Sequence, residues 1–232
     1  MSGLLINSFA GVSDPPYATQ IMNASPTAYW KFGETVSPVP DQSGNGHTAT
    51  VQAGSALTYS NSGPEENSVR QTGTARFNTP VGLSIGGAGH YMMMASVYPE
   101  AAMNDRCLFG AWSGNGVMFY IDNSGVGAGE LLCGHGANVY YTGIKLALNT
   151  WSHIMAGWDG TNSQCWINGT RYVNTAVATG TTARTAPQVG TYDSRAGSSW
   201  VGRYQHIAYF SGAAADALLT TAQAVKFSAA AR

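Results

Sequence analysis

The sequence predicts an all-β protein built as a sandwich of two antiparallel sheets. Short segments of alternating apolar and polar residues recur along the chain, and Asn-Gly, Asp-Gly and other glycine-rich turns separate them. Glycine contributes 29 of the 232 residues, a high share that suits many short strands joined by tight turns. Sandwiches commonly reach this length as one unit, so we expect a single sandwich domain.

One stretch carries the clearest strand pattern. It contains two strand-length segments, Trp151–Trp158 and Ser163–Ile167. Asp159-Gly160 follows the first segment and Asn168-Gly169 follows the second. Both dipeptides tolerate the positive φ angles of tight hairpin turns. We therefore expect a meander of antiparallel strands in this part of the chain.

The alternation of side chains along a strand assigns these residues to two faces. Ile154, Ala156 and Trp158 share one face of the first strand, and Cys165 and Ile167 share one face of the second. The residues expected on the opposite faces are His153, Met155, Gln164 and Trp166. In the same way, a run of three methionines is expected to send Met92 and Met94 to one face and Met93 to the other.

Further strands are predicted along the rest of the chain. They lie near Ala28–Phe32, Thr48–Val51, Thr74–Asn78, His90–Tyr98, Arg106–Ala111, Gly116–Asp122, Glu130–Cys133, Val139–Thr142, Arg171–Val177, Gln188–Gly190 and Trp200–Phe210. We expect the sandwich to span residues 28–212. Its predicted core contains Trp30, Phe32, Phe77, Ile154, Trp158, Ile167, Ile207 and Tyr209.

Four motifs occur in the order of a known family. They are the Tyr-Trp strand at Tyr29, the turn Asp41-Gln42-Ser43-Gly44-Asn45-Gly46, the meander described above, and the strand Gly202–Phe210. Over residues 28–230 the chain therefore resembles the concanavalin A-like jelly rolls of the laminin G type. The resemblance implies a jelly-roll sandwich with a short helix after the last strand. Gln205 and His206 stand where that family usually has an acidic pair.

Two segments flank the predicted sandwich. Residues 1–27 form an expected N-terminal arm with a short helix near Tyr17–Asn23, and residues 28–232 form the sandwich with its terminal helix. The spacing of Thr220 and Gln223 is that of a capping box, so this helix is predicted at residues 221–228. The arm begins with an apolar group, which we predict to be a protein interface. Its members are Leu4, Leu5, Ile6 and Phe9.

Composition argues against several classes of partner. The net charge is −1 and the eleven basic residues are scattered, so we expect no nucleic-acid partner and no anionic membrane surface. Charged residues make up only 10% of the chain, which leaves the surface poorly protected against association with other proteins. Three widely spaced cysteines without a Cys-x-x-Cys pair are expected to be buried free thiols, typical of a protein made in a reducing cytoplasm.

Catalytic and metal sites are not indicated. A glycosidase needs two carboxyl groups on either side of the scissile bond, and no Glu-x-Asp or Glu-x-x-x-Glu pair occurs on a predicted strand. The histidines lack metal-ligand spacing, and the loops at Asp122 and Asp193 each offer one acid where calcium prefers several. We expect a protein without enzymatic activity, cofactor or metal.

A glycan is a possible ligand, because exposed aromatic rings near loops can stack on sugars. The candidate contacts are Trp112, Tyr140, Tyr141, Tyr192 and Trp200.

Two functions are compatible with these features. The first is a structural protein of a virus particle, such as a bacteriophage capsid decoration or tail-associated protein. It would be made in the host cytoplasm and would dock on other virion proteins or on its own copies through the arm. Met1 without a following export signal, together with the arm, favours this hypothesis. The alternative is a carbohydrate-binding, lectin-like module that acts outside the cell or at its surface.

Overall fold

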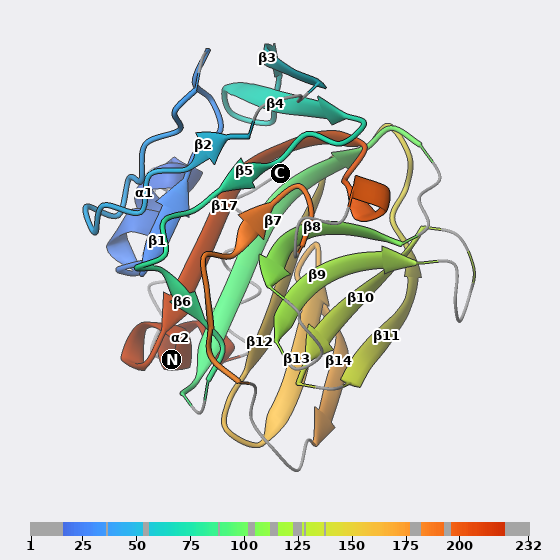
Figure 1. The fold of residues 1–232 in the computed structure, drawn as a ribbon. Helices are drawn as coiled ribbons and strands as arrows, with labels where there is room; N and C mark the ends of the chain where they lie inside the picture. The colour runs from blue at the N-terminus through green and yellow to red at the C-terminus, as the bar shows by residue number, and fades with distance from the viewer. Residues whose placement is uncertain are drawn as a thin grey trace, which may run out of the picture.

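The computed structural model describes residues 16–220, apart from residues 36, 53–55, 88, 102–104, 112–115, 123–126, 128, 137, 177–181 and 193–195. Within these residues the chain forms two large sheets that face each other, with two short helices on one side (Figure 1). All pairings between the named strands are antiparallel. The predicted all-β, two-sheet sandwich is thus confirmed.

The eight-stranded sheet has the order β14-β13-β12-β7-β17-β4-β3, and β1 pairs with β17 beside this path. Its strands are β1 (Ala28–Trp30), β3 (Ala56–Ser62), β4 (Asn67–Thr72), β7 (Tyr91–Pro99), β12 (Ser152–Trp158), β13 (Asn162–Ile167), β14 (Thr170–Ala176) and β17 (Gly202–Ser211).

The seven-stranded sheet has the order β11-β10-β9-β8-β16-β5-β2. Its strands are β2 (Thr50–Val51), β5 (Phe77–Asn78), β8 (Arg106–Ala111), β9 (Val117–Asp122), β10 (Glu130–His135), β11 (Asn138–Lys145) and β16 (Gln188–Val189). The remaining elements are the small pair β6 (Ser84–Ile85) and β15 (Arg184–Thr185), the 3-10 turn η1 (Ala196–Ser198), and the helices α1 (Tyr17–Asn23) and α2 (Ala213–Leu219).

The main hydrophobic core lies between the two sheets. All eight predicted core residues belong to it, and each is 6% exposed or less. Strand alternation explains the result: in β12, Ile154, Ala156 and Trp158 point into this core, while Met155 points to the other side of the sheet. Met93 likewise faces the core and its neighbours face away, as expected.

A second hydrophobic layer covers the outer face of the eight-stranded sheet. Tyr17 and Ile21 of α1 and Leu218 of α2 pack in one cluster with Met155 and Trp166 of the sheet. Both helices lie against this sheet in Figure 1. The Glu65 carboxylate accepts a hydrogen bond of 2.6 Å from the Tyr17 amide, which satisfies a free N–H in the first turn of α1. We call this outer face, with its two helices, the sealed face.

Two histidines are buried beneath α1 on the sealed face. The Tyr17 hydroxyl lies 2.8 Å from Nε2 of His153, and the Tyr29 hydroxyl lies 2.7 Å from Nδ1 of His206. The pKa of each histidine is lowered to about 3, mainly by burial. The second cause is His206 in the case of His153, and Lys31 in the case of His206. Burial outweighs the Glu65 carboxylate 3.5 Å from His206 Nε2, so both rings are neutral at pH 7.

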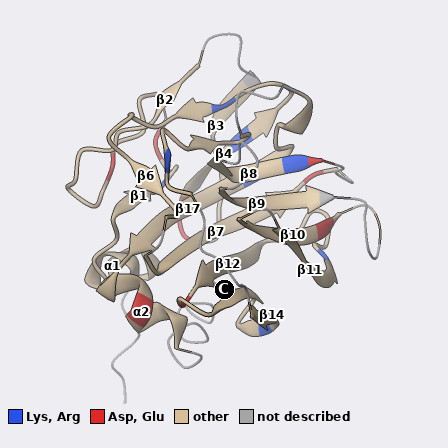
Figure 2. Ribbon diagram, turned by 60° about the horizontal axis from the view of Figure 1, so that its bottom comes forward, with Lys and Arg blue, Asp and Glu red and all other residues tan. Residues whose placement is uncertain are grey.

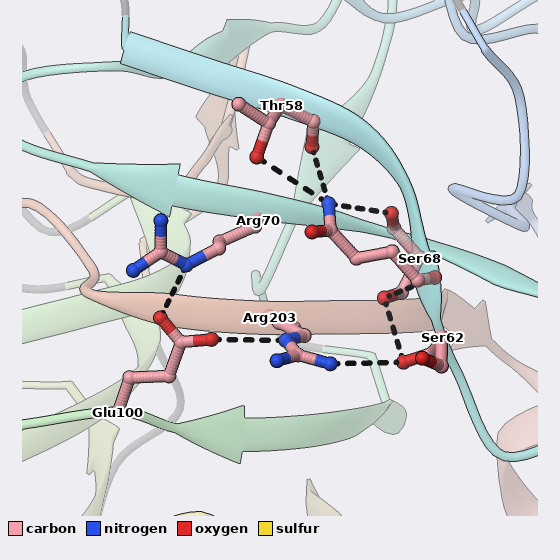
Figure 3. A network of polar contacts seen from close by, with 7 residues as sticks. Thr58, Ser62, Ser68, Arg70, Glu100 and Arg203 are labelled. Atoms are coloured by element: carbon pink, nitrogen blue, oxygen red, sulfur yellow. Dashed lines mark hydrogen bonds and ion pairs between the residues drawn. The ribbon is translucent and has the colours of Figure 1, made fainter.

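A polar network joins β3, β4 and β17 to the end of β7 at one end of the eight-stranded sheet (Figure 3). Glu100, directly after β7, accepts hydrogen bonds from Arg70 of β4 at 2.5 Å and from Arg203 of β17 at 2.9 Å. The Arg203 guanidinium also lies 4.7 Å from the centre of the Tyr98 ring. The Glu100 side chain is only 12% exposed, so its charge requires both cationic partners.

Several expectations need correction or lie outside the described residues. The predicted helix α1 is confirmed, but residues 16–27 fold back onto the chain's own sheet rather than extending as an arm. A short helix does follow the last strand, but it spans Ala213–Leu219, ahead of the predicted one, and Thr220 is its extended C-cap. The predicted helix at residues 221–228 and the apolar group at residues 4–9 fall outside the described part of the chain.

Strands β3 and β4 were not predicted. Ser60, Asn61 and Ser62 of β3 and the polar residues of β4 hide the alternation that identifies a half-buried strand. Of the helices that the structure describes, none has the length and apolar character needed to span a membrane. Lys and Arg are scattered over the ribbon in Figure 2, as the composition predicts.

Candidate functional site: the tyrosine face

The outer face of the seven-stranded sheet is the candidate site, because α1 and α2 both cover the other sheet. Strand register places Tyr141 of β11, Leu132 of β10 and Tyr120 of β9 in one row. Residues directly opposite on neighbouring antiparallel strands lie on the same face. The neighbours of these residues along each strand, such as Cys133 and Phe119, point into the main core. Because side chains alternate along a strand, the row itself points outward.

Three tyrosines therefore gather on this outer face. Tyr141 is 51% exposed, and the Tyr120 ring is half-buried. The ring of Tyr192 packs edge-on against Tyr120, with centroids 6.1 Å apart and an interplanar angle of 74°. Tyr120 and Tyr192 form a small cluster with Cys107, Met118 and Val139 that is separate from the main core. We use the name tyrosine face for Tyr141, Tyr120 and Val139, together with Leu132 and Tyr192, which lie among them but are buried.

One carboxylate borders the tyrosine face. The Tyr120 hydroxyl donates a hydrogen bond of 2.5 Å to Oδ1 of Asp105, which lies just before β8 and is exposed. This bond fixes the orientation of the ring and leaves the second carboxylate oxygen, Oδ2, as a possible acceptor for a ligand hydroxyl. An exposed aromatic ring beside an oriented carboxylate is suited to a ligand that is both apolar and rich in hydroxyls.

The predicted glycan contacts are distributed differently from the expectation. Tyr141 lies on the tyrosine face and is exposed, whereas Tyr140 points to the opposite side and packs against the main core. Tyr192 belongs to the face but is only 5% exposed, so it supports Tyr120 instead of offering its own ring. The prediction of an exposed ring is wrong for Trp200, which is fully buried in the core. Trp112 lies outside the described residues.

Tyr120 was missed as a candidate. It lies in a predicted strand, whereas the predicted contacts are aromatic residues at or near loops. The alternation of the strand does carry a signal, because Phe119 and Ile121 take the core positions and leave Tyr120 on the other face. The proximity of Tyr120 to Tyr141 depends on strand order and register, which the sequence alone does not reveal.

Two acidic residues are paired in the strand register at one end of this sheet. Glu130, the first residue of β10, is directly opposite Asp122, the last residue of β9. The pattern of two acids on one strand does not reveal this arrangement. Facing acids on neighbouring strands are the other way to place two carboxyl groups beside a glycosidic bond. The Glu130 side chain is fully buried, however, and its Oε1 accepts a hydrogen bond of 2.8 Å from the Gly143 amide. Gly143 has a φ of 72° beside an irregularity in the β10–β11 register, so Glu130 holds a turn of backbone in place.

Two hollows lie away from the tyrosine face. A cleft of about 260 Å³ between β11 and β14 includes Lys145, Thr170 and the 42% exposed Tyr172 in its lining. A second hollow of about 320 Å³ lies beside α1 and is lined in part by Tyr29 and Lys31. In the described part of the chain, no three residues of the His, Cys, Asp or Glu types are grouped so that they could hold a metal ion.

The sequence matches the profile of a known protein superfamily. The profile of the Concanavalin A-like lectin/glucanases superfamily, laminin G type, matches residues 71–217. No protein with a curated description matches the sequence.

Several solved structures share the fold. Domain 4 of AbnA, a GH43 extracellular arabinanase from Geobacillus stearothermophilus crystallised with arabinotriose, is similar with a TM-score of 0.69 and 19% identity. The alignment covers 88% of this chain and 98% of that domain. The binding domain of Paraclostridial Mosquitocidal Protein 1 is similar with a TM-score of 0.69 and 11% identity over 89% of this chain and 52% of its own.

The receptor-binding domain of Botulinum neurotoxin type G is also similar, with a TM-score of 0.62 and 10% identity over 88% of this chain and 51% of its own. The chain thus spans about half of the two toxin domains and nearly all of the arabinanase domain. At these identities the likeness establishes the fold alone.

Proposed function

The chain belongs to the Concanavalin A-like lectin/glucanases superfamily, and on that premise we propose that it is a non-catalytic carbohydrate-binding module whose ligand binds the tyrosine face. One observation carries the proposal: the exposed Tyr141 and the half-buried Tyr120 stand in one row on the outer face that the helices leave open. Among the described residues, the aromatic and methionine side chains of the opposite outer face that cluster with α1 and α2 are buried.

The geometry favours an oligosaccharide over a single sugar. Tyr141 and Tyr120 belong to strands separated by one strand, so their backbones are roughly 10 Å apart. An extended ligand that crosses the strands contacts both rings through the apolar faces of its sugars. The Asp105 carboxylate, oriented by Tyr120, accepts a hydrogen bond from a ligand hydroxyl.

The low charge of the chain favours a neutral glycan. Charged residues make up 10% of the sequence, and Asp105 carries a negative charge at the border of the site. An acidic polysaccharide would be repelled there, whereas a neutral one is not. The arabinanase domain, whose structure contains arabinotriose, makes neutral arabino-oligosaccharides the first ligands to test.

Isothermal titration calorimetry against arabino-oligosaccharides, followed by a panel of neutral cell-wall and cell-surface glycans, tests the proposal. Replacing Tyr141 with Ala is expected to weaken binding about 5- to 30-fold, equivalent to the loss of about 1–2 kcal/mol of ring contact. Tyr120→Ala is expected to have a similar effect. Tyr172→Ala is the matched control, because Tyr172 is a comparably exposed tyrosine on β14, outside the tyrosine face.

Two outcomes would contradict the proposal. Loss of binding in Tyr172→Ala, with none in Tyr141→Ala, would move the site to the cleft between β11 and β14. Absence of binding to every glycan in the panel would reject carbohydrate recognition itself.

The virion role remains a prediction with less support. It depends on an interface at residues 4–9, which lie outside the described part of the chain. The comparisons give more support to the glycan-binding alternative. The three similar structures described above are binding domains by their names or contain a bound oligosaccharide, while other similar structures are of a sialidase. Deletion of residues 2–14 tests the arm: if the virion hypothesis is correct, thermal stability is retained while self-association or binding to particles is lost.

A further inference from the structure

Two of the three cysteines meet in the centre of the sandwich. Cys133 lies in β10 of the seven-stranded sheet, and Cys165 lies in β13 of the eight-stranded sheet. Both side chains point into the main core, where they are 2% and 0% exposed. Their Sγ atoms are 2.6 Å apart, about half an ångström more than the length of an S–S bond of about 2.05 Å.

The two cysteines are far apart in the sequence and belong to different sheets. The two cysteines are separated by 32 positions, and no strand pairing joins β10 to β13. They approach because each occupies an inward position on its own sheet and the two positions face each other across the core. A disulfide can bridge two sheets that face each other across a core, as the intersheet disulfide of immunoglobulin domains demonstrates.

We propose that Cys133 and Cys165 form an intersheet disulfide when the chain folds under oxidising conditions. The two thiols give up two hydrogen atoms to a disulfide oxidant such as oxidised glutathione. One thiolate attacks the oxidant and expels one reduced thiol, and the second cysteine then attacks the mixed disulfide and expels the other. The product is one S–S bond in the protein and two molecules of reduced thiol.

Burial determines when this bond can form. Burial, together with the hydrogen bond to Cys165, raises the pKa of the Cys133 thiol well above its usual value. Only a thiolate attacks a disulfide, so the closed sandwich exchanges slowly. The bond therefore forms during folding, as the two sheets meet and before the core is closed to the oxidant, and later reduction requires the core to open.

The third cysteine supplies an internal reference. Cys107 faces the other side of the seven-stranded sheet, in the cluster beneath the tyrosine face. The sheet itself therefore separates Cys107 from the pair. In the oxidised protein we therefore expect one cysteine to stay reduced, namely Cys107.

Thiol counting on the full chain tests the proposal. The protein is folded in a buffer of reduced and oxidised glutathione, denatured without reductant, and treated with N-ethylmaleimide before mass spectrometry. We expect one alkylated cysteine, and three after prior reduction. Peptide mapping should recover a cross-linked pair that contains Cys133 and Cys165. Three alkylated cysteines in the oxidised sample would overturn the proposal.

Thermal unfolding with and without reductant tests the bond through its effect on stability. A bridge that closes this loop is expected to raise the midpoint of unfolding by about 5–15 °C under non-reducing conditions. The readout is the difference caused by reductant, because Cys133→Ser also disturbs packing. Cys107→Ser should keep that difference and Cys133→Ser should lose it. A reductant-dependent difference that persists in Cys133→Ser would contradict the assignment. If Cys133→Ser does not fold, the thiol count on the unaltered chain still decides the matter.

Discussion

The two outer faces of the sandwich are built from similar strands but differ in what covers them. On the sealed face, α1 and α2 bury methionine and aromatic side chains in a second hydrophobic layer. On the tyrosine face, the corresponding outward positions hold Tyr141 and Tyr120, which retain contact with solvent. Large side chains that point away from the core are thus covered by helices on one sheet, whereas Tyr141 and Tyr120 keep contact with solvent on the other.

This difference also separates stability from function. A residue of the sealed face contacts two layers, so its loss leaves a cavity. The exposed Tyr141 of the tyrosine face contacts one layer and solvent, so its loss removes little that holds the fold together. Substitutions on the two faces should therefore affect different measurements.

The largest effect is expected for Trp166 on the sealed face. The side chain is fully buried between β13 and the helices, so Trp166→Ala should reduce the free energy of unfolding by about 3–5 kcal/mol. Urea denaturation followed by far-ultraviolet circular dichroism measures this change. A loss below about 1 kcal/mol would show that the helices do not seal this face in solution.

The second effect is a pH dependence that belongs to the sealed face. His153 and His206 have a pKa of about 3 in the fold and an ordinary value of 6.5 when exposed. As the pH falls, the unfolded chain binds protons first, so stability is full above pH 6.5 and is lost progressively toward pH 3. At pH 5 the expected loss is about 2 kcal/mol for each histidine.

The residues that face these histidines define the controls for the pH experiment. They are Tyr17 of α1, Tyr29 of β1, and the side chains of Lys31 and Glu65. Urea midpoints measured from pH 8 to pH 4 should decline less steeply in His153→Gln and His206→Gln. An unchanged slope in the double variant would show that other groups cause the acid sensitivity.

A smaller effect is expected at the border of the tyrosine face. Glu130→Gln keeps the shape of the side chain but weakens its hydrogen bond to the Gly143 amide, so stability should fall by about 1 kcal/mol. Incubation with glycans and a reducing-end assay should detect no turnover in either the variant or the unaltered protein. Turnover that Glu130→Gln abolishes would instead make Glu130 a catalytic residue.

The smallest effect on stability is expected for Tyr141→Ala. The side chain is 51% exposed and lies outside the main core, so the free energy of unfolding should change by no more than about 0.5 kcal/mol. Together with weaker glycan binding, this result would sharpen the contrast between the two faces. A loss of several kcal/mol would indicate that Tyr141 supports the fold.

Local patterns in the sequence determined much of the architecture. The alternation of β12 and β13 assigned Ile154, Met155 and Trp166 to the correct faces, and the predicted core residues are all buried. The bounds of α1 at Tyr17–Asn23 also agree with the prediction. These features depend on side-chain direction and turn chemistry within a few residues, which a sequence displays directly.

Only the tertiary structure decided which side chains meet across the chain. Trp200 looked like an exposed loop residue but lies in the core, and Tyr120 looked like an ordinary strand residue but lies beside Tyr141. The contact of Cys133 with Cys165 belongs to the same class. Each depends on strand order, on register, or on which layer covers a face. Those choices arise from the packing of distant segments, so no local pattern in the sequence specifies them.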